Sequence, residues 1–129
     1  MHDKIFGTVI HGLGRGKDFG FPTVNIRLID SNLHMENGVY VVLVNICSGV
    51  ARNVPTAYKG MLYVGTRPTL DLQETTIEIH LLDFNEDIYN QQISFQIFHK
   101  IRNEVRFKNV NDLVEQLHRD KKMVYNYFL

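Results

Sequence analysis

The 129-residue chain has no tryptophan, only three prolines and a single cysteine, Cys47. One cysteine cannot form a disulfide within the chain, so a disulfide-stapled scaffold is excluded and a reducing compartment fits. Because Cys47 sits in an apolar run, we expect a small buried hydrophobic residue rather than a nucleophile. The length is that of one domain, which can bury a core without structural metal.

An excess of charge is missing as well, since 14 Lys and Arg balance 14 Asp and Glu. A neutral chain has no overall field that would draw it to nucleic acid or to an anionic membrane, so we expect neither partner. No apolar stretch approaches the length of a membrane span, and residues 1–18 lack the apolar core of a signal peptide. We expect a cytoplasmic protein, with a monomer as the simplest state.

Short segments rich in β-branched and aromatic residues, separated by turn-prone residues, dominate the first hundred positions. Alternation of apolar and polar residues is clearest at 76–81 and 93–97, as in half-buried antiparallel strands. The pattern predicts strands at 4–11, 38–47, 56–65, 75–84 and 92–102.

The period changes near the C-terminus, where apolar residues recur at helical spacing and Asn109 or Asn111 could cap the start of a helix. Lys121 interrupts the apolar stripe. The sequence therefore predicts a mainly β domain, a small barrel or curled sheet of five or six strands with one helix laid against it.

Residues 12–25, GLGRGKDFGFPTVN, join a glycine-rich loop to a polar cluster. Glycine can turn with positive φ and bring N–H groups close to an anion, and Arg15 and Lys17 add positive charge. The spacing is not a Walker A motif, because Asp18 follows the lysine, nor a dinucleotide fingerprint, because Pro22 keeps the chain extended where a helix should open. A phosphate cradle and a plain surface loop both remain open.

Three further clusters carry polar chemistry. Thr23 and Asn25 alternate in an extended segment, so their oxygens would share a side, either as Mg²⁺ ligands or as a polar strand face. Glu78 lies on a strand, where it could act as a general base or simply face solvent. Arg102 and Phe107 lie in the charged exit IRNEVRF, which suits an aromatic or anionic ligand or forms a surface turn.

Taken together, these motifs resemble those of the riboflavin kinases, ATP-dependent flavokinases that also form the C-terminal half of bacterial bifunctional riboflavin kinase/FAD synthetases. The matching segments occur in family order over essentially the whole chain: GTVIHGLGRG, GFPTVN, GVY, VGTRPTL, IEIHLLDF, DIY and IRNEVRF. The resemblance implies a six-stranded antiparallel Greek-key barrel with the C-terminal helix packed outside. It also implies transfer of the γ-phosphoryl of ATP to the 5′-hydroxyl of riboflavin, giving FMN and ADP.

The resemblance also assigns roles to residues. It makes Glu78 the catalytic base and Thr23 and Asn25 the Mg²⁺ ligands. The residues that it places at the nucleotide are Gly12, Gly14, Arg15, Gly16, Lys17, Gly20, Thr23, Leu81, Asp83 and Tyr89. The residues that it places in a segment closing on the flavin are Arg102, Val105 and Phe107. Asn90 replaces the glycine usual after the tyrosine, and asparagine tolerates the left-handed geometry needed there.

Bifunctional members of the family carry an adenylyltransferase domain before the kinase domain. Residues 1–129 correspond to the kinase domain alone, so we expect FMN but not FAD as product. The alternative is a non-catalytic barrel that binds a flavin or nucleotide, which would not need Glu78 or the Thr23 and Asn25 pair. A barrel that binds single-stranded nucleic acid would show a basic groove with interleaved aromatics, which the neutral balance disfavours.

Overall fold

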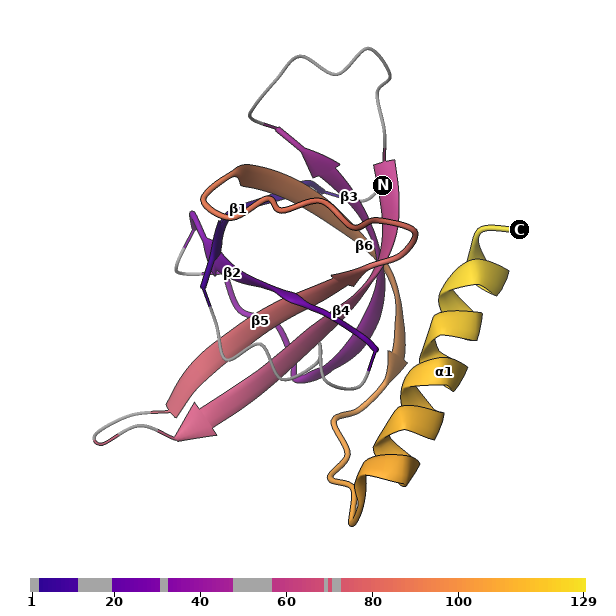
Figure 1. Ribbon diagram of the computed structural model, residues 1–129. Coiled ribbons are helices and arrows are strands. Elements are labelled where there is room, and N and C mark those ends of the chain that lie inside the picture. The colour runs from indigo at the N-terminus through magenta and orange to yellow at the C-terminus, as the bar shows by residue number, and fades with distance from the viewer. Residues whose placement is uncertain (1–2, 12–19, 31–32, 48–56, 69, 71–72) are drawn as a thin grey trace.

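The computed structural model describes residues 3–11, 20–30, 33–47, 57–68, 70 and 73–129. Within them the chain forms six strands and one helix: β1 (Ile5–Ile10), β2 (Val24–Leu28), β3 (Gly38–Ile46), β4 (Ala57–Pro68), β5 (Gln73–Leu81), β6 (Gln92–Arg102) and α1 (Val110–Tyr127). The strands close into a barrel in the order β1-β2-β5-β4-β3-β6, and every neighbouring pair is antiparallel (Figure 1).

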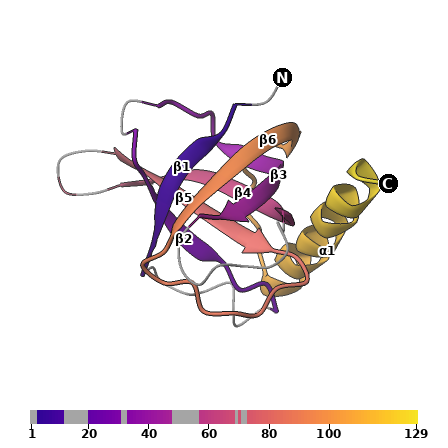
Figure 2. The same ribbon diagram turned by 90° about the horizontal axis from the view of Figure 1, so that it is seen from above.

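The prediction of a small antiparallel barrel with an outer helix is confirmed. Strand β6 returns to lie beside β3, so the spatial order β6-β3-β4-β5 is that of a Greek key. In Figure 2 the helix lies outside the barrel and to one side of it. The five predicted strands are all present, with ends that differ by at most three residues.

Two expectations need correction. The segment of β2 was predicted only as extended chain, because its five residues, VNIRL, carry two polar side chains and give a weak strand pattern. Cys47 is exposed rather than buried, so its predicted burial is wrong. It lies one residue beyond the end of β3, where the alternation that buries Val42 and Val44 has ceased.

Alternation along the strands fills the barrel interior. In β5, Ile77, Ile79 and Leu81 point inward, while Glu78 and His80 point outward. The other buried residues of the interior cluster are Val9, Ile26, Tyr40, Val42, Val44, Leu62, Val64, Ile88, Ile93 and Phe95. Burial of this inner face therefore fixes which polar residues face outward.

A second apolar cluster joins the outer face of the barrel to α1, which packs on β3 and β4. The helix begins after Asn109, whose side chain accepts a hydrogen bond from the backbone N–H of Asp112, so the first of the two predicted caps is confirmed. On the packed face, Asp120 is fully buried between Leu117 and Val124. Lys121 interrupts the apolar stripe in the sequence, but the polar residue buried on the packed face is its neighbour Asp120.

Replacing Phe95 with alanine should destabilise the barrel. Its ring is fully buried in the interior cluster, so Phe95→Ala should lower the free energy of unfolding by about 3–5 kcal/mol, measured by urea denaturation. Phe6, on the neighbouring strand, is 48% exposed, so Phe6→Ala should change it by about 0.5 kcal/mol or less. Equal effects of the two substitutions would contradict the placement of the core.

Candidate active site

One row of paired residues crosses five strands on the outer face of the barrel. The pairs run Asn25–Glu78, Glu78–Tyr63, Tyr63–Val39 and Val39–Arg102, from β2 through β5, β4 and β3 to β6. Directly paired residues of antiparallel strands point to the same face, so these side chains share one surface. With neighbouring strands about 4.8 Å apart, Glu78 lies one spacing from Asn25 and three spacings, roughly 14 Å along the curved sheet, from Arg102.

Thr23 and Glu78 are in direct contact at one end of this row. The hydroxyl of Thr23 donates a hydrogen bond to Glu78 Oε1 at 3.2 Å, across 55 residues of sequence. A hydroxyl that donates its proton still has lone pairs for a cation, so Thr23 can orient the carboxylate and offer an oxygen ligand at once. The structure thus brings together the predicted base and the two predicted metal ligands, since Asn25 is paired with Glu78.

His80 attaches the turn before Thr23 to strand β5. Its Nδ1 lies 2.7 Å from the carbonyl oxygen of Pro22. Since a carbonyl can only accept, Nδ1 carries the proton and donates. His80 is 7% exposed, and this burial lowers its pKa, although the hydrogen bond to Pro22 acts in the opposite direction. A neutral His80 therefore holds the turn that presents Thr23.

Phe21 is held between two histidine rings. Its ring lies 5.2 Å from that of His80 on β5 and 5.0 Å from that of His118 on α1, edge-on in both contacts, and it is 3% exposed. The preceding Gly20 has a φ of +80°, while a Cβ there would meet nothing within 4 Å. Backbone conformation rather than lack of space therefore calls for glycine at this position.

Tyr89 lies beside the residue that leads into the glycine-rich segment. Its ring stacks on His11, with centroids 3.6 Å apart, and it is 48% exposed. The turn that carries it is joined to β1 by the N–H of Asn90 bonding to Val9. Asn90 has a φ of +68°, which confirms the left-handed geometry expected there. A half-exposed ring in this place can stack on a planar ligand.

Asp83 follows the end of β5 and is fixed to the helix. Its Oδ2 accepts a hydrogen bond of 2.8 Å from the hydroxyl of Tyr125, and this bond raises the pKa of Tyr125. Asp83 itself has a φ of +56°. Leu81, expected near the nucleotide, has its side chain in the barrel interior, so its side chain does not face the outer surface that carries Glu78.

Five of the residues expected at the nucleotide lie outside the described residues: Gly12, Gly14, Arg15, Gly16 and Lys17. The two ends of their segment are described, at His11 and Gly20. His11 is stacked on Tyr89, and Gly20 leads directly into Phe21 and Pro22 beside Glu78's strand. Both ends are thus attached to parts of the barrel that carry other expected nucleotide-side residues.

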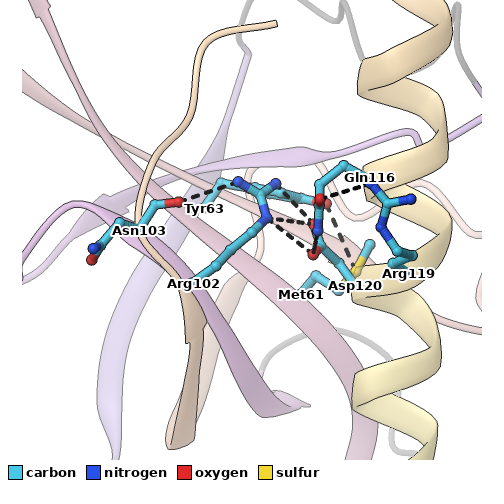
Figure 3. A network of polar contacts seen from close by, with 7 residues as sticks. All are labelled: Met61, Tyr63, Arg102, Asn103, Gln116, Arg119 and Asp120. Atoms are coloured by element: carbon cyan, nitrogen blue, oxygen red, sulfur yellow. Dashed lines mark hydrogen bonds and ion pairs between the residues drawn. The ribbon is translucent and has the colours of Figure 1, made fainter.

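Arg102, expected at the flavin, makes its contacts with the protein itself. Its guanidinium forms a bidentate ion pair with the buried Asp120 of α1, at 2.8 Å for the shortest contact (Figure 3). Val105 is 53% exposed, and the ring of Phe107 lies 5.8 Å from the guanidinium carbon. The structure places the end of β6 against the helix, with Val105 directed away from the core.

Tyr63 and Asp120 were not found by reasoning from the sequence. Tyr63 lies in the row between Glu78 and Val39. Burial, and to a smaller extent the negative charge of Asp120, raise the pKa of its hydroxyl, which therefore stays protonated. Its only strand signal was ordinary alternation. Asp120 did carry a signal, because it falls at the spacing of Leu113, Leu117 and Val124, where a carboxylate is out of place.

The chemistry of the donors fits a hard cation. Thr23 offers a hydroxyl and Asn25 an amide oxygen, the neutral oxygen ligands that Mg²⁺ accepts together with water and phosphate. Among the described residues, no three His, Cys, Asp or Glu side chains lie together in a way that could hold a metal ion. Thr23 and Asn25 would therefore hold an ion together with oxygens from elsewhere.

Known proteins share this fold and these motifs. A family model described as Flavokinase, riboflavin kinase, matches residues 2–128. The chain belongs to the riboflavin kinase family. No helix among the described residues is long and apolar enough to cross a membrane.

Relatives of this riboflavin kinase family member include a bifunctional riboflavin kinase/FMN adenylyltransferase of Haemophilus influenzae, 38% identical over 125 residues. That alignment covers 97% of this chain and 38% of the relative, so the chain spans well under half of that protein. A crystal structure described as a macrolide-efflux protein from Streptococcus pneumoniae is similar at TM-score 0.84 and 35% identity, over 95% of this chain and 38% of the other. A riboflavin kinase from Trypanosoma brucei, at TM-score 0.67 and 22% identity over 96% and 78% of the chains, shares the fold.

The buried His80 should make stability depend on pH. Because its folded pKa lies below the usual 6.5, the unfolded chain binds more protons between those two values, and stability falls as the pH drops below 6.5. Above about pH 7 both states have a neutral His80, so His80 should no longer make stability depend on pH. His80→Asn keeps a donor for Pro22 without titrating, so urea denaturation from about pH 7 to 5 should show a shallower loss in this variant.

The exposed His34 provides a control. His34→Asn should keep the slope of the wild-type chain over the same pH range. If His80→Asn and the wild type lose stability in parallel, burial of a neutral His80 is contradicted.

Proposed function

We propose that this chain transfers the γ-phosphoryl group of ATP to the 5′-hydroxyl of riboflavin, giving FMN and ADP. The observation that supports it best is the order of the row on the outer face. Glu78 stands between the oxygen donors Thr23 and Asn25 on one side and Arg102 on the other. A kinase needs its base beside the acceptor hydroxyl, where the acceptor meets the phosphoryl donor, and this order is compatible with that position.

Glu78 acts as the general base. The O5′ oxygen of riboflavin forms a bond to the γ-phosphorus while the bond from that phosphorus to the bridging oxygen of ADP breaks. The proton of the hydroxyl passes to the Glu78 carboxylate, whose orientation is held by the Thr23 hydroxyl at 3.2 Å. Because Glu78 sits in the middle of a paired strand, its position does not depend on a loop.

Thr23 and Asn25 would hold Mg²⁺ on the phosphate side of the base. A bound ion would supply neutralisation of the charge on the transferring phosphates. The chain's own contribution is to fix both ligands: His80 holds the turn before Thr23, and strand pairing holds Asn25 beside Glu78.

Nucleotide and flavin occupy opposite ends of the site. The glycine-rich segment 12–20, with Arg15 and Lys17, supplies phosphate contacts, and Tyr89, stacked on His11, lies where the segment begins. The exposed Val105 and the Phe107 ring supply apolar contacts for the flavin ring. The single cysteine suits a reducing compartment, so we expect the activity in the cytoplasm, with FMN and not FAD as the product.

The rival function is a barrel that binds flavin or nucleotide without chemistry. Binding alone does not require a carboxylate oriented by a hydroxyl between the two ligand ends, and the contact from Thr23 to Glu78 favours catalysis. Incubation with riboflavin, ATP and Mg²⁺ followed by chromatography for FMN decides between the two. Binding of riboflavin without formation of FMN would establish the rival.

Removing the base should abolish turnover and spare binding. Glu78→Gln keeps an oxygen to accept from Thr23 but cannot take a proton, so kcat should fall about 10²- to 10⁴-fold while the KM for ATP changes little. Glu74→Gln, an exposed carboxylate on the same strand, serves as the matched control and should retain wild-type kcat. An undiminished rate in Glu78→Gln would remove Glu78 from the role.

Removing the Thr23 hydroxyl should weaken the response to metal. Thr23→Val keeps a β-branched side chain in the extended segment but loses the ligand oxygen, so the Mg²⁺ concentration for half-maximal rate should rise about tenfold. The assay is a titration of rate against Mg²⁺ at saturating riboflavin and ATP. If only kcat falls and the metal dependence is unchanged, Thr23 orients Glu78 and is not a ligand.

A further inference from the structure

The contact between the end of β6 and helix α1 is more than a surface ion pair. Asp120 is fully buried and the Arg102 side chain is 16% exposed. Arg102 Nε donates to both carboxylate oxygens, at 3.0 and 3.1 Å, and Nη2 donates to Oδ2 at 2.8 Å. Gln116, one turn earlier on α1, donates to Oδ1 at 2.9 Å, so the carboxylate is fully engaged (Figure 3). Such bidentate pairs fix direction as well as distance.

The remaining edge and face of the guanidinium point to the segment that follows β6. Nη1 donates to the carbonyl oxygen of Asn103 at 3.3 Å, and the guanidinium carbon lies 5.8 Å from the centre of the Phe107 ring. Asn103 and Phe107 are the two ends of the short segment 103–107. One side chain therefore contacts both ends of this segment while its other donors are held by Asp120.

No strand pairing supports this segment, because the ladder between β3 and β6 ends at Val39 and Arg102. Val105 in its middle is 53% exposed, whereas the Phe107 side chain at its end is half-buried. The Glu104 carboxylate lies beside Gly65 of β4, which gives the segment one contact with the barrel. The contacts through Arg102 are the ones that connect the segment to α1.

We propose that Asp120, assisted by Gln116, is a positioning residue for the flavin side of the site, acting through Arg102 on segment 103–107. This inference rests on the proposed function, since it takes that segment as the flavin contact. Arg102 is accordingly a linker to the helix: Nε and one N–H of Nη2 are engaged by Asp120, and one N–H of Nη1 is engaged by Asn103. The position of the flavin-side segment 103–107 thus depends on a helix that lies outside the barrel.

Two variants separate positioning from stability. Asp120→Asn leaves Arg102 with an unbalanced charge and should lower Tm by roughly 10 °C, because breaking a buried pair from one side is strongly destabilising. In Arg102→Leu/Asp120→Leu both charges are gone, and Tm should recover most of that loss, because well-packed apolar replacements of a buried pair are often neutral. The attachment of segment 103–107 to α1 is weakened in Asp120→Asn, which keeps one acceptor oxygen and no charge, and is missing in the double variant.

The readouts are riboflavin affinity, kinetics and amide exchange. Both variants should bind riboflavin about tenfold more weakly by quenching of flavin fluorescence, with a matching rise in the KM for riboflavin and a change of less than about twofold in the KM for ATP. Hydrogen–deuterium exchange of the amides in 103–107 should quicken in both. Glu115→Gln, an exposed acid on the same helix, should leave Tm, affinity and exchange unchanged.

The outcomes are distinguishable. If the double variant recovers wild-type riboflavin affinity and slow exchange along with Tm, the pair only stabilises the fold and the inference is overturned. An equal rise in both KM values would overturn it as well, since the effect would not be confined to the flavin side. Wild-type chain that binds riboflavin but forms no FMN would refute the proposed function while the affinity and exchange arms still decide the role of Asp120.

Discussion

The register of the closed barrel is the constraint on which the site depends. Burial of Ile77, Ile79 and Leu81 fixes the direction in which Glu78 points, and a shift of β5 by one residue would turn the carboxylate into the apolar interior. The same register pairs Glu78 with Asn25 on one side and Tyr63 on the other. Core packing and the geometry of the proposed active site therefore both follow from the register of the sheet, which leaves little freedom to change either separately.

Contacts outside the barrel complete what the register begins. His80 joins the turn of Thr23 to β5, and Phe21 beside it is enclosed by rings from β5 and α1. The helix also binds Arg102 through Asp120. Strand pairing fixes the order of the side chains across the outer face. The contacts of His80, Phe21 and Asp120 fix the position of the segments next to β2 and β6.

The sequence predicted the parts that arise from local pattern. Alternation at 76–81 predicted the half-buried strand that carries Glu78, and helical spacing predicted α1 with a cap at Asn109 or Asn111, of which the structure has Asn109. It did not show what meets across the barrel: the bond from Thr23 to Glu78 spans 55 residues, and Arg102 finds Asp120 only once β6 and α1 are packed. The predicted burial of Cys47 was wrong for a related reason, since apolar neighbours in the sequence do not show where a strand ends. The roles of the individual residues were predicted from the order of several motifs along the chain, because no single motif was specific enough to assign them.

Helix α1 also sets a distance. Asp120 binds Arg102 at the end of β6, and Tyr125 binds Asp83, the second residue after β5. Those two helix positions are five residues apart, which is about 7.5 Å along the axis. Because a helix does not stretch, it keeps a fixed distance between its contact with Arg102 and its contact with Asp83. Insertion of one residue between them would rotate one contact by about 100° relative to the other, and the helix could then keep only one of its two attachments.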